Sequence, residues 1–295
     1  MQTMPTTVKT SALPLPNGSL VLDQCCVQLT SQGKQFGPFH FHICPGEKIA
    51  IVGPSGAGKS TLLKLLSGEL MAQQGRILYS GFPLQSWQLA QLSRYRAVLA
   101  QQYQVAPGMQ TDLLIALGRV TRHHDLALND IVQQAAHLAH ASHLLGRRFE
   151  TLSGGEQARI HLARIFAQLW DMRGGIILVD EPLAALDPGL QIEMLESLDQ
   201  FVTQGGHAIV AVLHDINHTL QGFERLLLVK DGQLQHDLPC DFEAAPMLSK
   251  LFGIELAPHQ SQSQHRVLAP VRTSSAQKNT APHRIHTDDQ QARVA

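Results

Sequence analysis

The feature that most constrains this chain is a glycine-rich segment, GPSGAGKST, at residues 53–61. The short apolar run KIAIV stands directly before it, and KSTLLKLLSGEL continues from it with helical spacing. A β-branched run of this length is typical of a strand buried on both faces of a parallel sheet. The pattern G-x-x-x-x-G-K-[ST] between such a strand and a helix therefore predicts a phosphate-binding loop in an α/β fold.

Each part of this loop has a physical reason in phosphate binding. Glycines let the backbone turn its N–H groups inward, and the helix N-terminus adds a partial positive charge. Lys59 is expected to reach the β- and γ-phosphates, while the Ser60 hydroxyl ligates Mg²⁺ and Thr61 supports the α-phosphate. The residues expected to bind the nucleotide here are Gly53, Pro54, Ser55, Gly56, Ala57, Gly58, Lys59, Ser60 and Thr61. The loop alone does not decide among the classes of protein that carry it.

A second apolar run, GIILVDEP at residues 175–182, ends in two carboxylates. Asp180 is expected to hold Mg²⁺ through water, as the acidic partner of the phosphate-binding loop. Glu181 stands one residue further, where the strand ends, and is expected to accept a proton from the water that attacks the γ-phosphate. Two exposed acids at a strand end are common, so this interpretation depends on the loop described above.

The order of the apolar runs indicates the organisation of the chain. Strand-like runs alternate with helical patterns, which favours an α/β fold with a mostly parallel sheet, an antiparallel β part and a helical subdomain at about residues 102–165. Residues 1–18, with three prolines, are expected to form a flexible leader. The main domain is expected at 19–258, and residues 259–295, rich in Gln, Ser, His and Arg, are expected to be a disordered tail.

Composition argues against several classes of function. The formal net charge of −1 gives no overall basic field for nucleic acid. The four cysteines show no CxxC spacing, so a zinc site is not supported, and reduced cytosolic thiols are expected. No run approaches the roughly 18 apolar residues that span a bilayer, and the N-terminus lacks the apolar core of a signal peptide. The chain is therefore expected in the cytoplasm, held at a membrane only through other chains.

The hexapeptide LSGGEQ at residues 152–157 connects these observations to a family. The sequence resembles the ABC ATPases, whose signature motif this is, over roughly residues 19–258. The resemblance implies a P-loop core of ABC type with a helical signature subdomain. It also implies that the signature motif cradles the ATP held by a second copy, so that a homodimer encloses two ATP molecules. The residues implied in this cradle are Ser153, Gly154, Gly155 and Glu156, with Asp187 from LAALDP at the dimer interface.

Three further positions are interpreted through the same resemblance. Gln101, in VLAQQ, corresponds to a glutamine that contacts Mg²⁺ or the attacking water. His214, in AVLHD, corresponds to a switch histidine that hydrogen-bonds the γ-phosphate and the catalytic carboxylate. The family usually has an adenine-stacking aromatic residue about fifteen positions before the Pro-Gly turn at 45–46, but Thr30 stands there. We therefore expect adenine to be held by apolar contact and selected weakly.

Within the family, the chain is most similar to importer ATPases for hemin, iron siderophores and vitamin B12. The stretches that carry this similarity are YSGFPLQSW, RAVLAQQ, LLIALGR, LSGGEQARIHLARIFAQLW and LHDINHTL. The hemin branch is favoured through LARIFAQLW and AVLHDIN, and vitamin B12 import is the alternative. The resemblance implies polytopic permease subunits, a periplasmic solute-binding protein that acts through them, and a peripheral position at the cytoplasmic face of the inner membrane.

Other functions of ABC ATPases fit this chain less well than transport. Soluble ABC ATPases of DNA repair carry very long insertions between the two nucleotide motifs, and those of translation carry two cassettes, unlike this chain. A regulator without turnover is disfavoured by Glu181 and His214. His137, His140 and His143 are expected at i, i+3 and i+6 of one helix. They suggest either a heme- or metal-sensing role or a solvated polar face, and the second is favoured because no fixed ligand geometry is visible.

Overall fold

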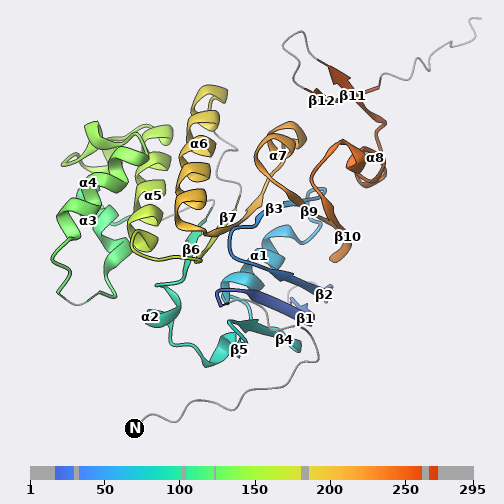
Figure 1. Ribbon diagram of the computed structural model, residues 1–295, viewed down its shortest axis with the longest axis horizontal. Helices are drawn as coiled ribbons and strands as arrows, with labels where there is room; N and C mark the ends of the chain where they lie inside the picture. Colours follow the sequence, from blue (N-terminus) through green and yellow to red (C-terminus); the bar gives the residue numbers. More distant parts are fainter. Residues whose placement is uncertain are drawn as a thin grey trace, which may run out of the picture.

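The computed structural model describes residues 17–29, 33–100, 104–122, 124–180, 186–260 and 266–271 of the 295-residue chain. The principal element is a six-stranded sheet with the order β10-β9-β3-β8-β7-β6 (Figure 1). Its strands are β10 (Gln233–Pro239), β9 (Arg225–Lys230), β3 (Lys48–Val52), β8 (Ala208–Val212), β7 (Ile176–Asp180) and β6 (Arg96–Leu99). Neighbours pair in parallel except for β10, which is antiparallel to β9. The mostly parallel sheet expected from the sequence is confirmed.

Alternate residues of the parallel strands enter two separate cores. In β3, Ile49 and Ile51 face the core under α1 (Lys59–Ser67), whereas Ala50 and Val52 face the core on the opposite side. Because both faces are covered, four successive positions of the strand are apolar. α1 lies between this sheet and a second, antiparallel sheet with the order β2-β1-β4-β5 (Figure 1). The strands of the second sheet are β1 (Leu20–Gln28), β2 (Gln35–Ile43), β4 (Gln74–Tyr79) and β5 (Phe82–Pro83).

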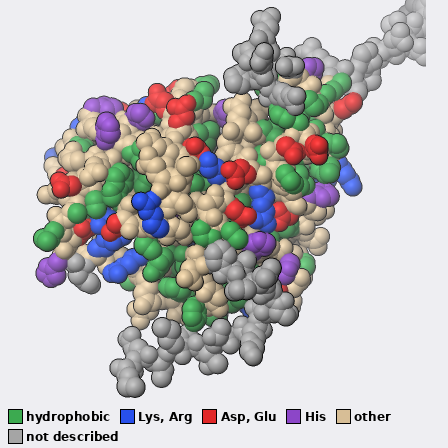
Figure 2. All heavy atoms as spheres, in the orientation of Figure 1, with side chains coloured by type: hydrophobic (Ala, Val, Ile, Leu, Met, Phe, Trp, Pro, Cys, Tyr) green, Lys and Arg blue, Asp and Glu red, His purple; other side chains and the backbone are tan. Residues whose placement is uncertain are grey.

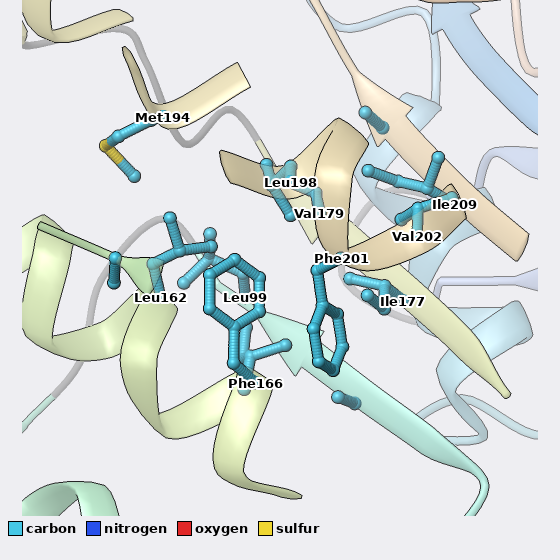
Figure 3. Packing of buried hydrophobic residues seen from close by; sticks show 14 of the residues in the cluster. Leu99, Leu162, Phe166, Ile177, Val179, Met194, Leu198, Phe201, Val202 and Ile209 are labelled. Carbon is cyan, nitrogen blue, oxygen red and sulfur yellow. The ribbon is translucent and has the colours of Figure 1, made fainter. Parts of the chain in front are cut away.

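Two long helices, α5 (Gly154–Leu169) and α6 (Pro188–Gly205), cover the other face of the six-stranded sheet. Their aromatic side chains meet there, since the ring centroids of Phe166 and Phe201 lie 4.5 Å apart. Figure 3 shows these rings beside Leu99, which β6 contributes. Burying an apolar side chain of this size contributes about 1.5–3 kcal/mol. The two helices are therefore held firmly against the strands that carry the nucleotide motifs.

The segment between β6 and β7 is helical, as the sequence predicted. Its elements before α5 are α3 (Thr111–Ala116), η2 (Leu117–Arg119), α4 (Leu128–Leu138), η3 (Ser142–Leu144) and η4 (Phe149–Thr151). Arg119 is buried and ties this part to α5, because its guanidinium donates to the carbonyl oxygen of Ala167 at 3.0 Å. The same guanidinium forms ion pairs with Asp125 and Asp171. Such pairing is needed for a buried charge to be tolerated.

The C-terminal part of the described chain differs from the expectation. After α7 (Ile216–Gly222), η5 (Phe242–Ala244) and α8 (Ala245–Phe252), the strands β11 (Leu256–Gln260) and β12 (Arg266–Pro270) form an antiparallel hairpin. Leu256 and Leu268 are only 8% and 3% exposed and join the core that includes α8. The predicted disorder from residue 259 is therefore wrong for this hairpin, because its leucines are anchored in a core that other segments supply. Residues 1–16 and 272–295 lie outside the described residues.

Several elements, among them β5, η1 (Leu84–Ser86), α2 (Leu89–Leu92) and β10, were not predicted from the sequence. β5 has two residues, and η1 and α2 follow it before β6. β10 is an edge strand whose sequence, QLQHDLP, is mostly exposed, so it shows no apolar alternation that could have indicated a strand.

None of the helices in the described ranges is long and apolar enough to cross a bilayer.

Candidate functional site

The predicted phosphate-binding loop joins the C-terminal end of β3 to α1. Only glycine fits at position 53, because a Cβ there would lie 2.1 Å from the carbonyl oxygen of Val229 in β9. Gly58 caps α1 with φ of 105°, a left-handed conformation that side chains with a Cβ rarely adopt. The N–H of Gly232 donates to the carbonyl oxygen of Ala57 at 2.9 Å and fastens the loop to the turn between β9 and β10.

Lys59 occupies the centre of this loop. Its side chain is 5% exposed, and Nζ donates to the carbonyl oxygens of Gly53 at 2.9 Å and Pro54 at 3.1 Å. The ammonium group is therefore held inside the curve of the backbone, while Ser55 and Gly56 at the tip are exposed. A cation held by carbonyl dipoles can exchange them for phosphate oxygens, which form stronger charge-assisted hydrogen bonds.

The Ser60 and Asp180 side chains meet across the sheet, as the two motifs predicted. Ser60, in the first turn of α1, donates its hydroxyl to Oδ1 of Asp180 at 3.3 Å. Asp180 ends β7, two strands away from β3, and is half-buried. A hydroxyl and a carboxylate oxygen are hard donors of the kind Mg²⁺ prefers, and an Mg²⁺ ion keeps several waters beside one or two such ligands. This pair therefore fits a magnesium ion bound beside phosphates.

Strand register brings the remaining chemical residues to the same edge. In the sheet, Ile51 pairs with Val212 and Val212 with Asp180, so His214, two residues beyond Val212, emerges beside both motifs and is exposed. Leu99 pairs with Val179, so β6 and β7 also end side by side. In open α/β sheets, ligands bind at the C-terminal ends of the strands. Gln101 and Glu181 continue from β6 and β7 but lie outside the described residues.

The aromatic ring of Phe36 lies against the phosphate-binding loop. A Cβ at Gly58 would stand 2.7 Å from Cδ1 of Phe36, and the ring is 5% exposed. Lys34 Nζ lies 5.4 Å from the centroid of this ring. Because the ring is buried, it supports the loop and offers no open face to a base. Thr30, which stands where the family usually has an adenine-stacking residue, lies outside the described residues.

The signature motif begins α5 with a capping box. The Ser153 hydroxyl accepts from the N–H of Glu156 at 3.3 Å, and the Glu156 carboxylate accepts from the N–H of Ser153 at 2.7 Å. These bonds from Ser153, with Arg147 close by, lower the pKa of Glu156. Glu156 was assigned to the nucleotide, but here its side chain closes the helix end. Ser153 and Gly154 stay exposed at a helix N-terminus, which suits an anion.

The two glycines of this motif meet different surroundings. A Cβ at Gly154 would have nothing within 4 Å, so this position is open to an approaching group. A Cβ at Gly155 would lie 2.4 Å from Cδ2 of Leu190, so this glycine permits the close packing of α5 on α6. Asp187 caps α6 by accepting from the N–H of Leu190 at 3.0 Å. The packing role of Gly155 could not be inferred from the sequence, since it depends on a partner in another helix.

A surface hollow of about 930 Å³ opens beside the signature motif. It is lined by Ser153, Asp187, Glu193 and the three histidines His137, His140 and His143, among others. The expectation that these histidines share one helix is wrong: α4 ends at Leu138, His140 has φ of 53°, and His143 lies in η3. Histidine side chains gather beside acidic ones over this part of the molecule in Figure 2. Among the described residues, no group of three or more His, Cys, Asp or Glu is placed to hold a metal ion.

A pair of segments that the sequence did not connect runs from the sheet edge to the signature motif. The N–H of Phe149 donates to the carbonyl oxygen of Met109 at 2.9 Å, and that of Thr111 to the carbonyl oxygen of Arg147 at 3.0 Å. The Gly108 N–H donates to the carboxylate of Glu150 at 3.1 Å. Residues 108–111 follow the segment of Gln101, and residues 147–150 immediately precede the signature motif.

Comparisons with known proteins agree with this arrangement. A family model described as ABC transporter matches residues 36–184. A hemin import ATP-binding protein HmuV of Methylobacillus flagellatus is 42% identical over 202 residues, which are 66% of this chain and 74% of that protein. The chain belongs to the ABC transporter family. The protein of the same name from Pseudomonas fluorescens Pf0-1 is 38% identical over 215 residues, 72% of this chain and 84% of that protein.

Solved structures give the same fold for this ABC ATPase. A chain of an ABC transporter in an inward-facing conformation has a TM-score of 0.71 at 23% identity, covering 86% of this chain and 98% of that chain. The ADP conformation of the ATP-binding cassette MJ1267 has a TM-score of 0.68 at 18% identity, covering 79% and 96%. The predicted ABC-type core is therefore confirmed, and ATP is the nucleotide of this family.

Proposed function

We propose that this ABC ATPase powers an importer of hemin or a related iron chelate. The observation that carries the ATPase part is the hydrogen bond from Ser60 to Asp180 at the sheet edge, where Lys59 and His214 also lie. The choice of hemin is supported by the relatives from Methylobacillus flagellatus and Pseudomonas fluorescens, both named as hemin import ATP-binding proteins.

The residues at the sheet edge divide the chemistry among themselves. Lys59 exchanges its carbonyl partners for the β- and γ-phosphate oxygens, and backbone N–H groups at the N-terminus of α1 bind these phosphates. Ser60 and Asp180 hold Mg²⁺, which when bound supplies positive charge against the phosphate oxygens. Glu181 accepts a proton from the attacking water, and Gln101 helps to orient that water. His214 donates a hydrogen bond to the γ-phosphate.

The second half of each site comes from another copy of the chain. Figure 1 shows α5 on the helical side of the molecule and α1 between the two sheets, so the signature motif and the phosphate-binding loop lie on different parts of one chain. The exposed N-terminus of α5 at Ser153 and Gly154 suits the γ-phosphate of a partner's ATP. Two copies related by a twofold axis would use both halves twice, with Asp187 beside the contact.

An exposed apolar surface supports a membrane subunit as a further partner. Leu113, Leu117 and Val120 follow at i, i+4 and i+7 and are 53%, 41% and 71% exposed. This stripe adjoins the segment after α2, since Arg94 donates to the carbonyl oxygen of Thr121 at 3.0 Å. Apolar side chains at this spacing suit a helical partner. Residues 108–111, at the head of this stripe, pair with residues 147–150 and offer a direct route from such a partner to the signature motif.

The proposal is tested with the complete transporter. We would purify the chain together with a candidate polytopic permease of the same organism, reconstitute both in lipid vesicles, and measure ATP hydrolysis and solute uptake. Hemin with its binding protein should stimulate hydrolysis and enter the vesicles, and Lys59→Ala should abolish both activities. Stimulation by vitamin B12 and not by hemin would overturn the assignment of the solute. Failure to associate with any permease, with ATP hydrolysis intact, would overturn transport in favour of a soluble ATPase.

A further inference from the structure

Asn217 joins the C-terminal hairpin to the helix that follows the switch histidine. Its side-chain amide donates to the carbonyl oxygen of Leu268 at 3.2 Å, and its side-chain oxygen accepts from the N–H of Leu268 at 2.9 Å. A side-chain amide carries one acceptor and two donors, so it can engage both backbone groups of a single residue. Asn217 thus acts as a strand partner for β12, although it lies in a helix 51 residues earlier in the chain.

The register of the hairpin explains why Leu268 has both groups available. Val271 donates its N–H to the carbonyl oxygen of Glu255 at 2.8 Å, so these two residues form a hydrogen-bonded pair. Such pairs alternate with non-bonded ones along an antiparallel ladder. Leu268, which is opposite Pro258, is therefore in a non-bonded pair, and Pro258 has no N–H to offer. The backbone of Leu268 faces away from β11, toward Asn217.

α7 itself depends on few other contacts. It has seven residues, which is too short to be stable through its own hydrogen bonds. Its N-terminus is capped by Asp215, which accepts from the N–H groups of Asn217 and His218 at 2.7 and 3.1 Å. Beneath the helix, Ile216 and Leu220 pack against the core that includes Leu248. The helix is therefore held by its cap, by apolar side chains, by the Cys240 thiol, which donates to the carbonyl oxygen of Thr219 at 3.4 Å, and by the pair with Leu268.

His214 is separated from α7 by the capping residue alone. A rotation or displacement of α7 must move Asp215 and with it the imidazole. We infer that Asn217 is a positioning residue for His214, and that docking of the hairpin through Leu268 sets the position of the switch histidine. This inference rests on the proposed ATPase function. The hairpin is the structural element through which the C-terminal part of the chain reaches the nucleotide site.

The decisive variants are Asn217→Ala, Leu268→Ala and their combination. Asn217→Ala should lower kcat for ATP hydrolysis about tenfold. This change follows if the loss of two hydrogen bonds shifts the equilibrium between the docked and the displaced position of α7 by about 1.4 kcal/mol. KM for ATP should stay within about twofold, because residues 53–61 hold the nucleotide. If the Leu268 side chain acts by anchoring the backbone that Asn217 engages, the double variant should be no slower than the slower single one. Gln221→Ala removes an exposed amide from the same helix and should change neither constant.

Hydrogen exchange provides a readout that does not need activity. Leu268→Ala should speed exchange in residues 213–222, and Asn217→Ala should speed it in β11 and β12, since a coupling between two sites is reciprocal. A fall in melting temperature with kcat unchanged would overturn the inference, as would additive losses in the double variant. If the unaltered protein and Gln221→Ala hydrolyse no ATP, the proposed function fails. The inference about Asn217 is then decided by hydrogen exchange alone. Faster hydrogen exchange that stays within the mutated element would overturn it.

Discussion

Acid should destabilise this protein through a histidine that is buried without charge. His207 lies between α6 and β8 and is 1% exposed. Its ring stacks on Phe201 with centroids 5.0 Å apart, and Nδ1 accepts from the N–H of Gly175 at 3.0 Å. Its other nitrogen faces Gly205, where an added Cβ would stand 2.1 Å from Nε2. The site therefore suits the neutral imidazole, because a second proton on Nδ1 would point at the Gly175 N–H.

The size of the effect follows from linkage. Burial, with a smaller contribution from Arg173, lowers the pKa of His207 from 6.5 to about 4. As the pH falls, the unfolded chain takes up a proton near pH 6.5, and the folded chain does so only near its lowered pKa. The stability that the neutral ring supplies is therefore complete above about pH 6.5 and is lost below it. Between pH 7 and pH 5, this one group should cost about 2 kcal/mol of unfolding free energy.

The assay is urea unfolding of the full chain at pH 7 and pH 5, followed by fluorescence. His207→Asn preserves an acceptor for the Gly175 N–H and cannot titrate, so about 2 kcal/mol of the difference between the two pH values should vanish. His161, whose pKa burial also lowers to about 4, leaves a residual dependence. His236→Asn removes an exposed imidazole and should retain the full difference. An equal pH dependence in His207→Asn and the unaltered protein would show that His207 does not cause this loss of stability.

Three further outcomes test the site. Glu181→Gln should bind ATP, accumulate as an ATP-bound dimer and hydrolyse it at least about 100-fold more slowly; near-normal turnover would remove this residue as the base. Ser153→Arg should bind ATP in each subunit but block ATP-driven dimerisation, measured by light scattering in the Glu181→Gln background, and unchanged dimerisation would contradict the composite site. Ala106→Glu should weaken permease association about tenfold while basal hydrolysis by the isolated chain persists. The reverse result would assign this segment to the chemistry. Gly108 is a poorer test, because its φ of 79° makes any substitution strained.

Motifs that act through their own backbone were predictable from the sequence. The phosphate-binding loop needs glycines, a lysine and a hydroxyl at fixed spacing, because the loop itself surrounds the phosphates. The apolar runs before Gly53 and Asp180 predicted parallel strands, since strands covered on both faces must be apolar throughout. The signature motif was recognised through its resemblance to the family, whereas the capping box that Ser153 and Glu156 form came from the structure.

Contacts between distant segments were decided only by the tertiary structure. Gly155 is small because Leu190 of another helix packs against it, and the three histidines line one hollow because the chain turns at His140. The chain from residue 259, which includes most of the C-terminal hairpin, was predicted to be disordered because a polar composition cannot build its own core. The hairpin forms by placing Leu268 in a core that other segments supply, with Asn217 as its partner. Local chemistry depends on neighbours in the sequence and can be read there, whereas burial depends on neighbours in space, which only the folded chain provides.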